Sequence, residues 1–106
     1  MPNKLLHIYK TPTAEKKIKE IIIFSAKKWG KKSAQKYALE LEKSIISVAE
    51  GKIKTKINKE FSSRFSYCRA KKHYIFFEII ENKLIVVALF HVAMDVKNLL
   101  DKNFIK

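Results

Sequence analysis

The apolar residues of this chain change their spacing along the sequence, and each spacing predicts a different element. The opening KLLHIYK carries bulky apolar residues before a turn-like TPT, which predicts a β-strand over about Lys4–Lys10. Apolar residues then recur every three or four positions, as on one face of a helix: Ile18, Ile21, Ile22, Ala26 and Trp29. Thr11 or Thr13 can cap this first helix, and Gly30 can supply the left-handed residue after its end near Trp29.

The same helical spacing returns after Gly30 and predicts a second helix from about Ser33 until Gly51 stops it. Its apolar stripe consists of Ala34, Tyr37, Ala38, Leu41, Ile45, Val48 and Ala49. Two amphipathic helices joined by about three residues form an antiparallel hairpin, and their common stripe must pack on another element. The polar KIKTKINKE that follows is predicted as a loop.

From Phe61 onward the sequence favours β-structure. RFSYCRA, HYIFFEII and KLIVVALFH are rich in β-branched and aromatic residues, and the short AKK and ENK connections predict an antiparallel three-stranded meander. A last short helix is predicted from about Ala93 to Leu100.

Strict alternation divides the residues of the last two strands between two faces. In the first, Ile75, Phe77 and Ile79 oppose Tyr74, Phe76, Glu78 and Ile80; in the second, Leu84, Val86, Ala88 and Phe90 oppose Ile85, Val87 and Leu89. Because both faces are apolar, we expect the helices to cover one and further chain or a partner to cover at least part of the other. The prediction is an α+β fold: an N-terminal strand, then a two-helix hairpin packed on a twisted antiparallel sheet.

Length and composition limit this fold to one domain. The chain has 106 residues, 47% of them hydrophobic, with two glycines and two prolines, so we expect a single domain over residues 1–106 without long linkers. One cysteine, Cys68, cannot form an internal disulfide. With no apolar run long enough for a membrane span and no signal-like start, we expect no membrane association and a cytoplasmic location.

Charge is the strongest compositional signal. Twenty-three Lys and Arg against ten Asp and Glu give a formal net charge of +13. Such a charge attracts polyanions or an acidic protein, and a merely solvated lysine-rich surface is an equally open interpretation.

Few residues suggest catalytic chemistry. Cys68, His73 and His91 match no metal-site spacing, so neither metal nor cofactor is expected, and Cys68 is expected to be a small buried apolar residue. His91 with Arg64 or Arg69 could carry out acid–base cleavage of RNA, although a histidine closing an apolar strand is more often structural. The aromatic residues could stack on bases between the lysines, but most of them are needed for the core.

Several short motifs, taken in order, resemble those of the ParE toxins. IIIFSAKKWGKKSAQKYALELEKSIISVAE, Ile21–Glu50, is similar to that family's helical hairpin. CRAKKHYIFFEI and ENKLIVVALFHVAMD resemble its later strands, through Cys68, His73, Ile75, Phe76, Phe77, Leu89, Phe90, His91, Met94 and Asp95. Departures from the family pattern are Phe77 in place of tyrosine, Ser66 and Tyr67 where an arginine is common, and no proline in GKIKTKINKE.

The resemblance implies the toxin half of a type II toxin–antitoxin pair in the wider ParE/RelE superfamily. ParE toxins poison DNA gyrase, whereas RelE relatives cut messenger RNA on the ribosome. The HVAMD ending resembles the ParE branch, so a non-catalytic gyrase inhibitor is expected, held in a hetero-oligomer by a ParD-like antitoxin with an acidic segment. The alternative is a RelE-like endoribonuclease acting on ribosome and messenger RNA through His91, Arg64 and Arg69. The residues expected to contact the target are Arg64, Arg69, Lys71, Lys72 and His91.

Overall fold

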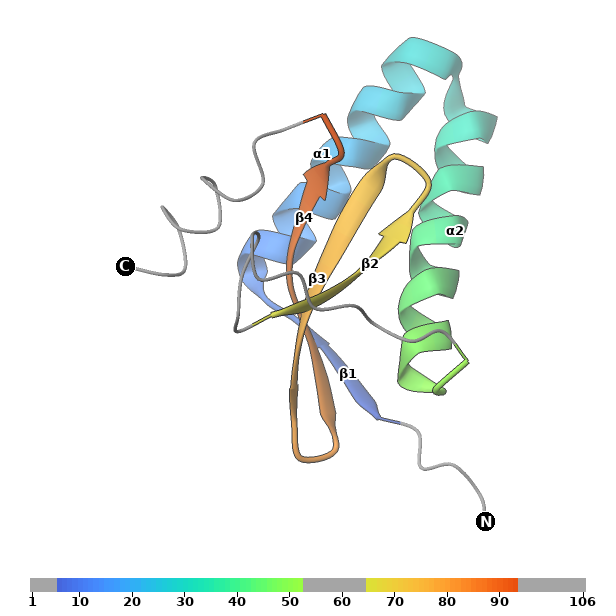
Figure 1. Ribbon diagram of the computed structural model, residues 1–106. Helices are drawn as coiled ribbons and strands as arrows, with labels where there is room; N and C mark the ends of the chain where they lie inside the picture. The colour runs from blue at the N-terminus through green and yellow to red at the C-terminus, as the bar shows by residue number, and fades with distance from the viewer. Residues whose placement is uncertain (1–5, 53–64, 94–106) are drawn as a thin grey trace.

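The computed structural model describes residues 6–52 and 65–93, which form one helical layer on one sheet. In chain order the elements are β1 (His7–Lys10), α1 (Pro12–Trp29), α2 (Lys31–Ala49), β2 (Ser66–Ala70), β3 (His73–Ile80) and β4 (Lys83–His91), as Figure 1 shows. This order confirms the predicted β-α-α-β-β-β arrangement and the α+β class. The predicted loop over most of KIKTKINKE and most of the predicted helix at Ala93–Leu100 lie outside the described residues.

The four strands form one mixed sheet in the order β1-β4-β3-β2. Strands β2, β3 and β4 pair antiparallel as predicted, but β1 pairs parallel with β4, from His7 opposite Lys83 to Lys10 opposite Val86. The predicted antiparallel meander is therefore confirmed, whereas the parallel pairing of β1 makes the whole sheet mixed rather than antiparallel. The physical reason is that the helical hairpin gives β1 a connection long enough to enter the sheet in the parallel direction.

Two residues define the start of the helical hairpin and the junction between its helices. Thr11 is the cap of α1: its hydroxyl accepts the Ala14 N–H at 3.1 Å and donates to the Val87 carbonyl oxygen at 2.9 Å. Gly30 alone joins α1 to α2, with φ 95° and ψ 165°, a region open almost only to glycine. Gly30 has the positive φ predicted for the residue after α1, but its ψ of 165° makes it the whole junction. The predicted three-residue connection and the start near Ser33 were wrong, because α2 begins at Lys31.

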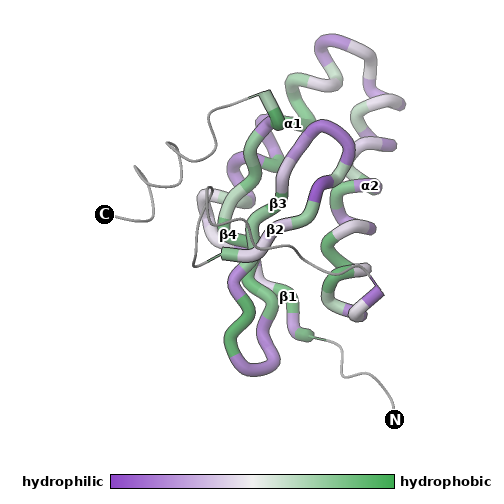
Figure 2. Tube along the Cα trace, viewed as in Figure 1, coloured by the Kyte–Doolittle hydropathy of each residue, from purple (hydrophilic) through white to green (hydrophobic). Residues whose placement is uncertain are grey.

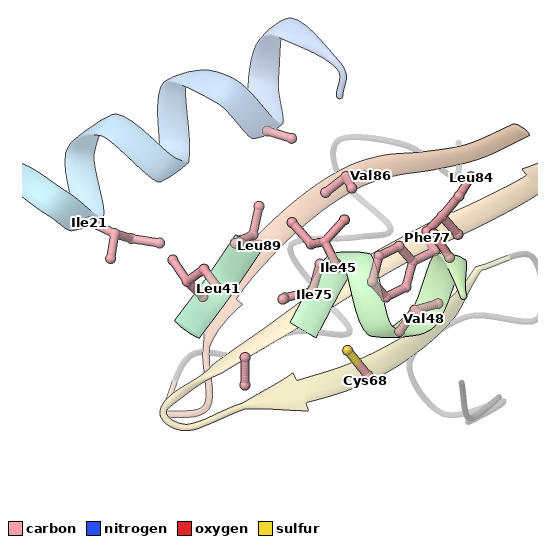
Figure 3. Close-up of a cluster of buried hydrophobic side chains, with 13 residues drawn as sticks. Ile21, Leu41, Ile45, Val48, Cys68, Ile75, Phe77, Leu84, Val86 and Leu89 are labelled. Carbon is pink, nitrogen blue, oxygen red and sulfur yellow. The ribbon is translucent and has the colours of Figure 1, made fainter. Parts of the chain in front are cut away.

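The main core lies between the helices and the face of the sheet that they cover. Figure 3 shows Leu41, Ile45 and Val48 of α2 and Ile21 of α1 directed toward the sheet. From the sheet come Cys68, Ile75, Phe77, Leu84, Val86 and Leu89. Burial of these side chains is the main stabilising contribution that the amphipathic stripes predict.

A β-bulge in β4 breaks the alternation along that strand. Phe76 lies opposite Ala88 while Phe77 lies opposite Val86, which leaves Val87 as the extra residue. As a result Leu89, rather than Ala88, joins Val86 in the main core. The predicted assignment of Ala88, Leu89 and Phe90 was wrong, since apolar residues on both faces give the sequence no means of marking a bulge.

The outer face of the sheet holds a second buried cluster of Phe65, Phe76, Val87 and Ala88. These side chains are buried within the chain itself, which agrees with the expectation that further chain covers part of this face. Within the described residues, neither helix is long and apolar enough to cross a membrane.

Candidate functional site

A groove opens where the helical hairpin extends past the end of the sheet, and its volume is about 970 Å³. Three parts of the chain surround it: α1 with the first half of α2, the turn between β2 and β3, and the adjoining ends of β3 and β4. Its lining consists of Lys17, Glu20, Ile21, Phe24, Ser25, Trp29, Ser33, Tyr37, Lys71, Lys72, His73 and His91. We call this surface the hairpin groove.

Two histidines and a tyrosine form the polar part of the groove. His73 at the start of β3 lies directly opposite His91 at the end of β4, with ring centroids 5.3 Å apart. The Tyr37 hydroxyl lies 2.5 Å from Nδ1 of His73, and the Nδ1 of His91 accepts the Ala93 N–H at 3.1 Å. Antiparallel pairing therefore brings together two histidines that are 18 positions apart in sequence.

Burial favours the uncharged forms of His73 and Tyr37. It lowers the pKa of His73 to about 4, and the nearby charges of His91 and Lys17 act in the same direction. Burial also raises the pKa of Tyr37, and Glu40 adds to this, while a backbone hydrogen bond from Lys72 opposes it. Imidazole and phenol thus offer hydrogen bonds without a formal charge.

One wall of the groove is aromatic and open to solvent. Phe24 and Trp29 are 59% and 55% exposed, and their rings meet edge to face with centroids 6.3 Å apart. Trp29 belongs to the stripe that the sequence predicts to be core-facing, so that part of the prediction was wrong. The reason is that the end of α1 extends beyond the sheet, where nothing in the described chain covers the indole.

The rim of the groove is basic. Lys71 and Lys72 form the tight turn between β2 and β3, and Lys71 has a positive φ of 54°. This turn is held from two sides: Arg69 Nε donates to the Lys71 carbonyl oxygen at 2.7 Å, and Lys71 Nζ lies 3.1 Å from Glu40. Figure 2 shows the turn as a hydrophilic arch next to the helices. An apolar wall, neutral polar groups and a cationic rim together suit an amphipathic acidic segment.

Comparison with known proteins identifies the family. The family model for the ParE toxin of the type II toxin–antitoxin system parDE matches residues 8–96. The chain belongs to the ParE toxin family. The match extends over β1 through β4, and therefore over every element that lines the hairpin groove.

The fold of this ParE-family toxin is also found in a solved structure. That structure, described as "Chromosomal ParDE TA system from P. aeruginosa", superposes with a TM-score of 0.73 at 9% sequence identity. The match covers 84% of this chain and 98% of the other. No curated protein matches the chain at a significant level.

The structure separates the predicted site residues of the toxin into two groups. Lys71, Lys72 and His91 line the hairpin groove. Arg69 does not: its neighbours Cys68 and Ala70 both face the helices, so the Arg69 side chain leaves β2 on the outer face of the sheet. Arg64 lies outside the described residues.

The structure places Cys68, one of the three candidate metal ligands of the sequence, in the main core. Across residues 6–52 and 65–93, no three His, Cys, Asp or Glu side chains are grouped as metal ligands. Cys68 is a free, buried cysteine in the main core, and burial raises the pKa of its thiol to about 11. It is the small buried residue that the sequence predicts.

Sequence reasoning missed four residues of the groove: Phe24, Trp29, Tyr37 and His73. Trp29 and Tyr37 were assigned to the core-facing helical stripes, and Phe24 was given no role. His73 was considered only as a metal ligand or as part of the family pattern. The groove forms where the two helices extend beyond the end of the sheet. The spacing of apolar residues along the sequence does not indicate where the sheet ends.

Proposed function

We propose that this ParE-family toxin arrests growth by inhibiting DNA gyrase in the cytoplasm, and that a ParD-like antitoxin silences it. The observation that carries the proposal is the family match over residues 8–96. In this reading the toxin is a binder rather than a catalyst, and its partner forms a hetero-oligomer with it.

The hairpin groove is the site we assign to the antitoxin. A segment that folds on binding can place apolar side chains against Phe24 and Trp29 and carboxylates near Lys17, Lys71 and Lys72. The neutral Tyr37 and His73 would then accept or donate hydrogen bonds without the desolvation cost of a buried charge.

We assign the contact with gyrase to the basic turn between β2 and β3. Arg69, Lys71 and Lys72 lie together at the β2–β3 turn, with His91 beside it in the groove and Arg64 as a further candidate. Antitoxin bound in the groove would cover Lys71, Lys72 and His91, so a single event would both mask the target surface and neutralise the toxin.

The RelE-like ribonuclease is the second candidate. In this alternative His91 would take part in the proton transfer. It is half-buried in the groove, and its Nδ1 accepts the Ala93 N–H, so that Nε2 is the ring nitrogen available to the substrate. Arg69 cannot easily assist, because it leaves the sheet on the face opposite His91. This separation favours the binding function over catalysis.

The deciding experiment measures both activities of the antitoxin-free protein. We expect purified gyrase to lose supercoiling activity and accumulate cleaved DNA, while messenger RNA in a translating extract stays intact. Codon-phased cuts in the messenger RNA with normal supercoiling would instead support the ribonuclease.

Two charge-matched variants locate the contact with gyrase. Lys71→Ala with Lys72→Ala removes two charges from the rim of the groove, and Lys16→Ala with Lys19→Ala removes two from the exposed first half of α1. We expect the first pair to weaken inhibition at least tenfold and the second to change it little. Equal weakening would mean that net charge, rather than this turn, attracts the enzyme.

A further inference from the structure

The end of the helical hairpin carries a concentration of positive charge that the proposed antitoxin site does not use. Between Glu20 and Glu40 the sequence has five lysines and no acidic residue. They are Lys27, Lys28, Lys31, Lys32 and Lys36, on either side of the junction at Gly30. Together with Phe24 and Trp29 we call them the helical tip, which lies at the hydrophilic upper end of the hairpin in Figure 2.

Within the described residues, no carboxylate neutralises the lysines of the tip. Elsewhere in the described chain Lys10, Lys52 and Lys71 pair with Glu42, Glu50 and Glu40. Among the same described residues, none of the five tip lysines forms such a pair. Their mutual repulsion therefore remains, and an approaching polyanion would relieve it.

The first turn of α2 adds to this unfavourable charge. It contains Lys31 and Lys32, has no acidic residue, and receives no side-chain cap from Gly30. Cations at the positive end of a helix typically destabilise it by a few tenths of a kcal/mol each. A local arrangement that works against folding is expected mainly where function requires it.

The aromatic rings of the tip are exposed among these cations. Lys28 Nζ lies 5.6 Å from the centroid of Phe24 and 5.0 Å from that of Trp29. Both rings are more than half exposed, so a flat ligand can reach them. Exposed rings between cations are what binding of an unpaired nucleic-acid strand requires, since bases stack on rings and phosphates pair with the cations.

An acidic peptide in the hairpin groove does not account for the tip. The cations that line the groove are Lys17, Lys71 and Lys72, and none of the five tip lysines lines it. A peptide seated there would leave the charge of the tip without a partner. A nucleic-acid strand has one phosphate per nucleotide and could run across both helices.

We propose that the helical tip binds a single strand of DNA, with phosphates on its lysines and one base stacked on Trp29. Duplex DNA satisfies the lysines but keeps its bases stacked within the helix, so the indole contributes less to its binding. The choice of DNA over RNA rests on the proposed action at gyrase, where the toxin meets DNA.

The test uses the full chain and a fluorescein-labelled oligodeoxythymidylate of 15 nucleotides. Binding is followed by anisotropy of the label and by fluorescence of Trp29, the sole tryptophan, which lies where the tip meets the groove, and the lysine variants below distinguish the two surfaces. With about five phosphates neutralised, the logarithm of the binding constant should fall by about 3 to 4 per decade of salt. Stacking on the oligonucleotide should quench the indole.

Two sets of lysine variants distinguish binding at the tip from a general effect of net charge. Lys27→Gln with Lys31→Gln and Lys32→Gln should weaken binding on the order of a hundredfold at low salt and flatten the salt dependence by about two. The matched control, Lys16→Gln with Lys19→Gln and Lys43→Gln, removes the same charge at the far end of the hairpin and should have a small effect. Trp29→Ala should weaken binding about tenfold, and Trp29→Phe should retain most of the affinity.

Four results would overturn the proposal: equal weakening by the two lysine triples, unchanged Trp29 fluorescence on binding, equal affinity for duplex DNA, or tighter binding of RNA of the same sequence. Binding of an acidic peptide of equal charge that is weakened as strongly by Lys27→Gln with Lys31→Gln and Lys32→Gln would assign the tip to a protein partner instead. Because the assay contains no gyrase, its failure leaves the proposed inhibition intact. Failure of gyrase inhibition likewise leaves the affinity for the oligonucleotide unchanged.

Discussion

His73 is the buried histidine of the described residues. Its imidazole is 8% exposed, hydrogen-bonded to Tyr37, and faces His91 across the strand pair. From the sequence it could be recognised only as a candidate metal ligand and as a position of the family pattern. Its buried position depends on α2, which brings Tyr37 over the end of β3.

The stability of the protein should therefore fall in acid. In the folded state the pKa of His73 is about 4, whereas an unfolded histidine titrates near about 6.5. Between these values the unfolded chain binds a proton that the folded chain does not. The free energy of unfolding should thus decrease by up to about 3 kcal/mol as the pH falls from about 6.5 to about 4, with no further loss below that range from this group.

Urea unfolding at a series of pH values, compared with His73→Gln, measures this contribution. The glutamine oxygen can still accept a hydrogen bond from Tyr37, so the variant should fold, with a smaller dependence on pH in the same window. Identical pH profiles of the two proteins would refute the assignment. Carboxylates that titrate near pH 4 affect both proteins alike and cancel in the difference.

The hairpin turns through a single residue, Gly30, in a conformation that other residues avoid. A Cβ atom built at Gly30 meets nothing within 4 Å, so a substitution there costs backbone strain without a clash. We expect Gly30→Ala to destabilise the protein by about 1–3 kcal/mol. Calorimetry should record a melting temperature lower by several degrees.

The exposed position Ser33 in the first half of α2 offers a control for Gly30→Ala. Ser33→Ala should leave the melting temperature nearly unchanged, because it alters neither the junction nor the core. Equal stability of Gly30→Ala and the parent protein would mean that the junction has an alternative conformation of similar energy.

Thr11 joins the first helix to the bulged strand. Its hydroxyl caps α1 through the Ala14 N–H and also donates to the carbonyl oxygen of Val87, the extra residue of the bulge. Thr11→Val keeps the shape and removes both bonds, so it should destabilise the protein by about 1–2 kcal/mol. Thr11→Ser keeps the hydroxyl and should lose much less in the same denaturant titration; comparable losses would show that the methyl group, not the hydroxyl, is responsible.

At the scale of the molecule, binding of an acidic partner in the hairpin groove should stabilise the folded protein. A ligand present at about a hundred times its dissociation constant stabilises the folded state by about 2.7 kcal/mol. A cognate antitoxin segment should therefore raise the melting temperature by on the order of 10 °C.

Two neighbouring residues of α1 provide the variants for this thermal-shift measurement. Phe24 lines the groove and Ile23 does not, yet both side chains are more than half exposed. Phe24→Glu should abolish the shift, because it places a negative charge on the apolar wall, whereas Ile23→Glu should retain it. A shift that survives in Phe24→Glu would place the antitoxin elsewhere.

Local signals in the sequence determined the elements and most of the core. The spacing of Ile21, Leu41 and Ile45 predicted the buried helical stripe, and the threonines before Ala14 predicted the start of α1. These features depend on contacts within a few residues, so the sequence alone suffices to predict them.

Only the tertiary structure decided the features that depend on distant pairing. The parallel entry of β1 beside β4, the bulge at Val87 and the meeting of His73 with His91 each join residues far apart in the chain. The exposure of Trp29 is of the same kind, because the sequence shows an apolar stripe but not the point at which the sheet beneath it ends. The periodicity of a sequence predicts on which face of its helix or strand a residue lies. Whether another element packs against that face is determined only by the tertiary structure.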